Sequence, residues 1–149
     1  MVRVQRVFEV DKPPADVVRY LSDFSNTEEW DPGTVACWRM GEGAIGVGAR
    51  WHNVSKLLGS KTELTYELTR LEPDRVTFVG TNKTARTVDD LSVSPAGSGA
   101  RITYRATIEL VGWAKVAEPL MKLVFEHLGN AVVRSLAGVL SSTRPRHAK

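Results

Sequence analysis

Residues that form covalent or metal-bound cross-links are scarce in this sequence. Cys37 is the only cysteine among 149 residues, and there are three histidines. A single thiol can form no disulfide within the chain and cannot build a cysteine-based metal cluster. We therefore expect no metal site, and the lone cysteine favours a protein of the reducing cytoplasm.

Motifs that mark a cofactor or a common catalytic site are also missing. The sequence contains no Gly-rich phosphate loop, no nucleophile elbow, no paired-histidine metal motif and no Ser-His-Asp arrangement at a recognisable spacing. These absences predict a protein without a bound cofactor. They leave open whether the chain is an enzyme or a binding protein.

Long apolar runs and a strong charge of either sign are absent too. No stretch reaches the ~18 consecutive apolar residues of a membrane span, and Val2–Val7 lacks the apolar core of a signal peptide. The 20 basic and 17 acidic residues nearly balance, with a formal net charge of +3, so nucleic acid binding is not implied. We expect a cytoplasmic protein with no stable membrane insertion.

Basic residues form a cluster only at the end of the sequence, where Arg144, Arg146 and Lys149 lie close together. We interpret residues 143–149 as a flexible basic tail. With 42% hydrophobic and 25% charged residues, residues 1–142 fit one domain of ordinary soluble composition.

Strand signals dominate the first three quarters of the chain. Valines alternating with polar residues predict a strand over 2–10, and the two prolines at 13 and 14 begin a short helix that ends near Asp23. A second helical turn is expected over 25–30. Six further strands are predicted over residues 34–40, 49–58, 61–71, 75–80, 84–93 and 101–111. The short turns between them, rich in Gly, Pro, Asp and Ser, favour sequential antiparallel hairpins.

A long amphipathic helix is predicted from Trp113 to about residue 142. At about 100° per residue, four charged side chains share one arc of about 80°; they are Lys115, Glu118, Lys122 and Glu126. The opposite arc is expected to face a curved sheet, and it holds Ala117, Leu120, Met121, Val124, Leu128, Ala131, Val132, Leu136, Val139 and Leu140.

Alternation along the strands predicts which side chains face this helix. The expected inward set is Trp51, Asn53, Ser55, Leu57, Leu64, Tyr66, Leu68, Thr87, Asp89, Leu91, Val93, Ile102, Tyr104, Ala106, Ile108 and Leu110. The mixture of polar and aromatic residues favours an internal cavity that holds a small molecule. The alternative is a filled core in which the polar residues lie near strand ends and make ordinary hydrogen bonds.

Six short segments, in order along the chain, carry a resemblance to a known family. They are PADVVRYLSDF (14–24), WDPG (30–33), GVGARW (46–51), LTRLEP (68–73), GARITY (99–104) and EPLM (118–121). With the predicted order of elements, the chain resembles the bacterial polyketide cyclase/dehydrase family of the START and birch-pollen-allergen (SRPBCC) superfamily. The resemblance implies an α+β helix-grip fold: a seven-stranded curved antiparallel sheet wrapped around a long C-terminal helix, with two short helices after the first strand.

The resemblance also implies a hydrophobic ligand (a lipid, an aromatic or a polyketide-like molecule) in a cavity beneath the long helix. The residues that we expect to bind it are Trp38, Trp51, Asn53, Ser55, Tyr66, Phe78, Asp89, Tyr104, Leu120, Val124 and Leu128. An alternative is a cyclase/dehydratase-type enzyme that works without metal, with Asp89 and either a tyrosine or His127 handling protons. Asp89 could instead form an ion pair with Arg86 or Arg39, and His127 could be a boundary residue of the helix.

A third possibility is an interaction module of similar fold, which would have a filled core and a large apolar outer patch. The charged outer faces of the predicted strands argue against it. We expect a monomer or a homodimer.

Overall fold

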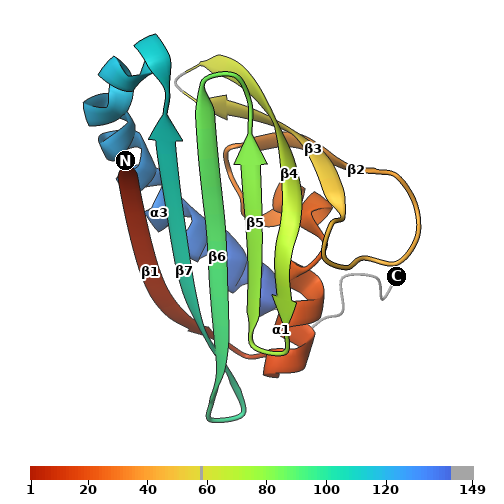
Figure 1. Cartoon of the computed structure of the whole chain (residues 1–149). Helices are drawn as coiled ribbons and strands as arrows, with labels where there is room; N and C mark the ends of the chain where they lie inside the picture. The colour runs from red at the N-terminus through yellow and green to blue at the C-terminus, as the bar shows by residue number, and fades with distance from the viewer. Residues whose placement is uncertain (58, 142–149) are drawn as a thin grey trace.

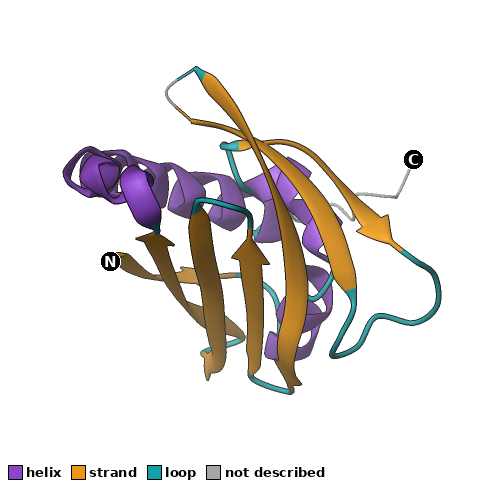
Figure 2. Ribbon diagram, turned by 45° about the horizontal axis from the view of Figure 1, so that its top comes forward, coloured by secondary structure: helices purple, strands orange, loops and turns teal. Residues whose placement is uncertain are grey.

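A curved antiparallel sheet packs against one long helix in the computed structural model, which describes residues 1–57 and 59–141 (Figure 1). The strands are β1 (Val2–Val10), β2 (Thr34–Met40), β3 (Arg50–Leu57), β4 (Ser60–Glu72), β5 (Arg75–Thr81), β6 (Ala85–Ala96) and β7 (Gly99–Leu110). The helical elements are α1 (Pro14–Leu21), η1 (Phe24–Asn26), α2 (Thr27–Trp30), η2 (Gly112–Ala117) and α3 (Glu118–Leu140). The predicted fold class is confirmed, and Figure 2 shows the helices gathered on one side of the sheet.

The strands follow the order β1-β7-β6-β5-β4-β3-β2 in the sheet. Successive hairpins connect β2 to β7, as the turn signals predicted. The first strand instead pairs with the last, from Val2 opposite Ile108 to Val10 opposite Ala100. Because α1, η1 and α2 lie between β1 and β2, the chain crosses from one edge of the sheet to the other before the hairpins begin.

The predicted strand ends differ from the observed ones by up to three residues. The largest differences lie at the β6–β7 hairpin, where β6 continues to Ala96 and β7 already begins at Gly99. Only Gly97 and Ser98 remain for the turn, and Gly97 has a φ of 60°, a conformation that glycine adopts without steric cost. The tail predicted over 143–149 lies outside the described residues.

An aromatic cluster fills one end of the space between the short helices and the sheet. The ring of Phe24 lies 4.2 Å from Tyr66 and 4.5 Å from Phe78, centroid to centroid. Trp51 meets Phe78 edge-on at 5.6 Å and donates from its indole nitrogen to Asp23 at 3.2 Å. Trp51 and Phe78 of this cluster are fully buried in the core.

The buried face of α3 is rotated from the predicted one. The buried residues are Phe125, Gly129, Val132, Leu136 and Leu140. At about 100° per residue this face lies about 80° from the centre of the predicted apolar arc. The helix is apolar around most of its circumference, so periodicity alone did not fix which part would meet the sheet.

Contacts with β1 set this rotation. A methyl group on Gly129 would lie 2.9 Å from Cγ2 of Val4, so only glycine lets the first strand come this close. Beside it, the Arg6 guanidinium donates to Glu126 Oε1 at 2.8 Å and to Asn130 Oδ1 at 2.9 Å. As a result Leu120 is 51% exposed and does not face the sheet, contrary to prediction.

The segment Gly112–Leu140 is long and apolar enough, by length and composition, to cross a membrane. Val132 and Leu136 in this segment are fully buried within the core. One face of the helix therefore forms part of the core beneath the sheet, while Leu120 and Leu123 on its other side are exposed.

Candidate functional site: a cavity between the sheet and the long helix

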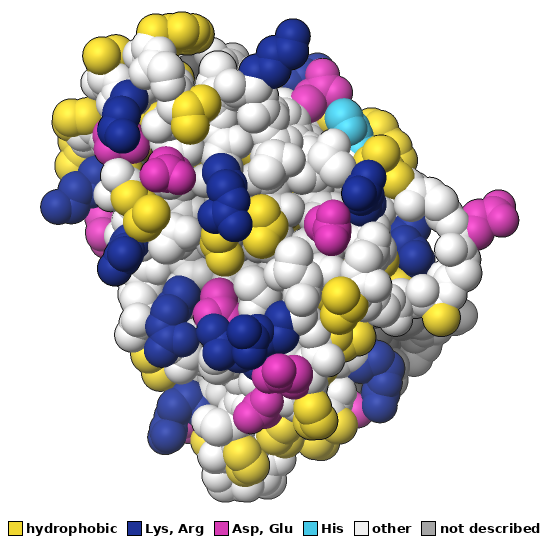
Figure 3. All heavy atoms as spheres, viewed as in Figure 1, with side chains coloured by type: hydrophobic (Ala, Val, Ile, Leu, Met, Phe, Trp, Pro, Cys, Tyr) yellow, Lys and Arg dark blue, Asp and Glu magenta, His cyan; other side chains and the backbone are white. Residues whose placement is uncertain are grey.

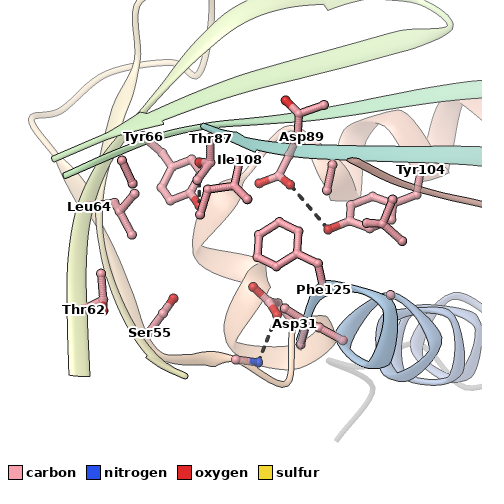
Figure 4. A pocket seen from close by; sticks show the side chains of 17 residues that line it. Asp31, Ser55, Thr62, Leu64, Tyr66, Thr87, Asp89, Tyr104, Ile108 and Phe125 are labelled. Carbon is pink, nitrogen blue, oxygen red and sulfur yellow. Dashed lines mark hydrogen bonds between the residues drawn. The ribbon is translucent and has the colours of Figure 1, made fainter. Parts of the chain in front are cut away.

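A cavity of about 80 Å³ lies between the concave face of the sheet and α3 (Figure 4). Its walls come from β1, β3, β4, β6, β7, the turn after α2, and one side of α3. The apolar part is formed by Val4, Leu64, Ala85, Ala106, Ile108, Phe125 and Leu128. Ala106 and Ile108, like Leu64 and Tyr66, lie two residues apart in their strands, so the period of two along the strands shapes much of the cavity wall.

One polar group in the cavity is the pair Tyr66 and Thr87. The Thr87 hydroxyl donates to the Tyr66 phenol oxygen at 3.1 Å, across β5. Gly80 lies between them in the sheet, and a methyl group there would come within 2.6 Å of the Tyr66 ring and 2.7 Å of Thr87 Oγ1. Burial raises the pKa of Tyr66 well above its ordinary value, and the charge of Asp89 adds to the effect, so the phenol stays neutral.

The second polar group is Asp89 with Tyr104. The Tyr104 hydroxyl is 3.4 Å from Asp89 Oδ1 and donates to it (Figure 4). Burial, and to a lesser extent the negative charge of Asp31, raise the pKa of Asp89 from its ordinary 3.8 to about 7, and the hydrogen bond from Tyr104 opposes the rise. Asp89 therefore exists in both protonation states near neutral pH.

Asp31, which follows α2, supplies a second carboxylate. Its Oδ1 accepts from the backbone N–H of Gly33 at 3.0 Å, and its Oδ2 accepts from the Thr34 hydroxyl at 3.0 Å. Burial raises the pKa of Asp31, and these two hydrogen bonds oppose the rise. The sequence indicated only a turn at Asp31–Gly33; the turn exists, but turn chemistry carries no information about the cavity beneath it.

No basic side chain lines the cavity among the described residues. The neighbouring Asp90 faces the other side of the sheet, where it accepts two hydrogen bonds from Arg75 at 2.9 and 2.7 Å. Arg39 lies over the Trp51 ring at 5.5 Å, with its nitrogens directed to carbonyl oxygens of the β2–β3 loop. The alternative in which Asp89 pairs with Arg86 or Arg39 is therefore wrong within the described part of the chain.

Five of the predicted ligand-binding residues line the cavity, and they are Ser55, Tyr66, Asp89, Tyr104 and Leu128. Three others lie behind its wall. Trp51 and Phe78 are fully buried in the aromatic cluster. Asn53 is also buried. Its polar atoms are satisfied there, because its amide nitrogen donates to Thr34 Oγ1 at 3.2 Å and its amide oxygen accepts from Ser55 at 2.6 Å.

Trp38 lies on the convex face of the sheet and does not line the cavity, contrary to prediction. It is 51% exposed, and its ring lies 4.8 Å from that of His52. Cys37 is buried on the concave side, so alternation places Trp38 outside. His52 also faces outward and contacts Glu63 at 2.6 Å.

Leu120, Val124 and His127 line a separate open groove on the outer side of α3 and not the cavity itself. The rotation of the helix explains their position. Gly33 and Leu128 line both the groove and the cavity. The groove, with a volume of about 480 Å³, therefore adjoins the cavity at these two residues.

Phe125 is the main cavity residue that the sequence interpretation missed on the helix. Its ring closes the cavity from the side of α3 (Figure 4). The contact between Gly129 and β1 determines the rotation that places it there, and the sequence carries no local signal of that contact.

The convex face of the sheet carries interspersed basic and acidic side chains, as Figure 3 shows. Ion pairs there include Arg101 with Glu9 at 3.0 Å and Arg50 with Glu67 at 3.4 Å. Hydrophobic side chains gather instead over η2, where Trp113 and Val116 are 81% and 84% exposed. The cavity, rather than the outer face of the sheet, thus combines an enclosed space with buried carboxyl and hydroxyl groups.

Residues 1–140 match the family model described as polyketide cyclase / dehydrase and lipid transport. A search of curated protein sequences finds no match.

Solved structures share the fold at low sequence identity. A START superfamily protein from Mycobacterium smegmatis is 14% identical, with a TM-score of 0.77 over 93% of this chain and 96% of that one. A protein from Thermus thermophilus is 18% identical, with a TM-score of 0.75 over 93% and 95%. The Zhui aromatase/cyclase from a Streptomyces species is 12% identical, with a TM-score of 0.76 over 93% and 92%.

Proposed function

Because the chain belongs to the polyketide cyclase / dehydrase and lipid transport family, we propose that it binds one hydrophobic small molecule between the sheet and α3. The observation that carries the proposal is the cavity itself, whose apolar wall surrounds a few converging polar groups. Small-molecule sites combine these two features, because apolar surface supplies affinity and placed polar groups fix orientation.

The free volume of about 80 Å³ is smaller than the roughly 300–1,000 Å³ of most ligand sites. A ligand of ordinary size therefore requires the adjoining groove as well. Leu128 stands between the two spaces, and it is only partly buried. A change of its rotamer joins cavity and groove without disturbing the buried residues Val132 and Leu136 farther along the helix.

A neutral fluorophore, N-phenyl-1-naphthylamine, tests this proposal. It is expected to bind with a stoichiometry near one and to be displaced by flat aromatic compounds. Ala106→Leu adds three carbon atoms to the cavity wall and should weaken binding by about tenfold or more. Ala44→Leu makes the same change in the exposed β2–β3 loop and serves as the matched control. Equal binding by both variants would contradict the proposed site.

A specific observation favours a second function, an acid/base enzyme of the cyclase or dehydratase type. Asp89 has a pKa of about 7 and lies against the Tyr104 hydroxyl, so it can accept a proton from a substrate and return it at neutral pH. Asp89→Asn would then lower turnover by about 10² or more and leave fluorophore affinity within a few-fold. A binding protein shows no turnover to lose.

A further inference from the structure

We infer that the cavity selects a hydrophobic molecule carrying one protonated nitrogen, and that the cationic end lies between Asp31 and Asp89. This inference rests on the proposed function and names the ligand class for the same site. Figure 4 shows Asp89 reaching the cavity from the sheet and Asp31 from the opposite side, with the Phe125 ring between them in this view.

The charges of the cavity wall are the first reason. Two carboxyl groups line it, and no lysine, arginine or histidine does so among the described residues; the basic residues Lys56 and His127 line only the adjoining groove. A fatty acid or a phosphate ester would add a third acid in a space that already disfavours two. A cation instead supplies the counter-charge that the protein itself does not provide.

Unused hydrogen-bond acceptors are the second reason. A carboxylate offers about four acceptor positions on its two oxygens. Asp89 receives one long hydrogen bond, from Tyr104 at 3.4 Å, while the other hydroxyls nearby, Thr87 and Tyr66, are paired with each other. An ammonium group brings up to three N–H donors and a positive charge. An alcohol brings a single O–H donor and no charge.

Aromatic rings are the third reason. Tyr66, Tyr104 and Phe125 all contribute to the wall beside the carboxyl groups. The faces of such rings attract cations, and the attraction grows where water is excluded. The remaining wall, including Leu64 and Ile108, is apolar and suits the hydrocarbon part of the molecule.

A metal ion fits the same charges less well. Hard divalent cations require six or more oxygen ligands or several retained waters. No group of three or more His, Cys, Asp or Glu side chains positioned to hold a metal occurs in residues 1–57 and 59–141. Two carboxyl groups set among aromatic rings favour an organic cation.

Four probes with the same phenylethyl framework test the inference: 2-phenylethylamine, 2-phenylethanol, ethylbenzene and 3-phenylpropionate. Each is titrated calorimetrically and by displacement of N-phenyl-1-naphthylamine at pH 7. The amine is expected to bind about tenfold more tightly than the alcohol, and the carboxylate most weakly. Asp89→Asn should reduce amine affinity about tenfold and leave ethylbenzene affinity within about twofold.

Asp90→Asn is the matched control, because it removes the adjacent carboxylate, which is held by Arg75 on the other face of the sheet. It should leave the preference for the amine intact. Asp31→Asn is the second cavity variant and should also weaken amine binding, so that the test does not depend on one substitution.

Proton release gives a further readout. The ionisable groups that face Asp89 are Asp31, Tyr66 and Tyr104, and both tyrosines stay neutral. A bound ammonium group favours the charged carboxylate, so amine binding at pH 7 should release about half a proton from Asp89. Calorimetry in two buffers of different ionisation enthalpy measures it, and Asp89→Asn should lose that part.

The outcomes separate the two proposals. If ethylbenzene and the fluorophore bind but the amine shows no advantage over 3-phenylpropionate, the selection of a cation is wrong and the binding function stands. Equal effects of Asp89→Asn and Asp90→Asn would also overturn the inference. If neither the fluorophore nor any of the four probes binds, the proposed function fails together with it.

Discussion

The pH dependence of stability offers a direct test of the environment assigned to Asp89. Its pKa rises from an ordinary 3.8 to about 7 on folding, so the folded protein binds this proton more tightly than the unfolded chain. The stability contributed by the neutral carboxyl group is complete below the unfolded value and is lost as the pH rises through about 7. Since each pKa unit is worth about 1.4 kcal/mol, the loss reaches about 4 kcal/mol.

Asp89→Asn keeps the shape of the side chain but cannot ionise. The variant should therefore be more stable than the parent protein by up to about 4 kcal/mol at pH 8, and by only about 1 kcal/mol at pH 4.5. Urea denaturation followed by tryptophan fluorescence at both pH values measures the difference. Asp31 adds to the pH dependence of the parent in the same direction, and comparing the two proteins removes most of that contribution.

Asp90→Asn provides the control with the opposite sign. The hydrogen bonds from Arg75 lower the pKa of Asp90, so its contribution to stability is present above the unfolded value and is lost only as the pH falls through the folded one. Replacing the Asp90 carboxylate should therefore lower the free energy of unfolding at pH 8, whereas replacing that of Asp89 should raise it. If Asp89→Asn changed stability equally at pH 4.5 and pH 8, Asp89 would be hydrated and the enclosed carboxyl group assigned here would be wrong.

Two further predictions concern packing. Gly80→Ala should cost about 1–3 kcal/mol, because the new methyl group meets the tyrosine and threonine of the cavity, whereas Gly138→Ala has open space on α3 and should stabilise by up to about 1 kcal/mol. Thermal unfolding of both checks this, and equal effects would refute the packing around Gly80. Leu136→Ala should cost about 2–5 kcal/mol and Leu120→Ala much less, since the first side chain is fully buried and the second is half exposed; a reversed order would show that the helix faces the sheet differently.

Local patterns in the sequence determined the elements and much of the cavity wall. Glycine and proline mark the turns, and β-branched or aromatic residues alternate with polar ones between them. Since successive side chains of a strand point to opposite faces, one inward residue fixes its whole strand. The inward positions of Asp89 and Tyr104 were predicted correctly for this reason. The inward position of Trp38 was predicted wrongly, because it did not follow from the alternation of inward and outward residues in its own strand.

Three features were decided only by the tertiary structure. The first is the rotation of α3, because a helix apolar around most of its circumference has a face wider than the sheet can cover, and the contact of Gly129 with Val4 selects the part that is buried. The second is the position of Asp31 in the cavity wall. Its local turn would form in the same way beside a cavity or beside solvent, so the sequence of the turn does not show which of the two the side chain faces.

The third is the lack of a cationic partner for Asp89 within residues 1–57 and 59–141. The nearest basic residues in sequence and in neighbouring strands face the convex side, where Arg75 pairs with Asp90 instead. Whether a carboxyl group is paired depends on distances across the sheet, and a linear pattern of charges does not contain them. The sequence by itself thus determined that an acid points inward, and only the packing of helix, sheet and turn decided that a second acid lines the same cavity, with no basic residue of the described chain in its wall.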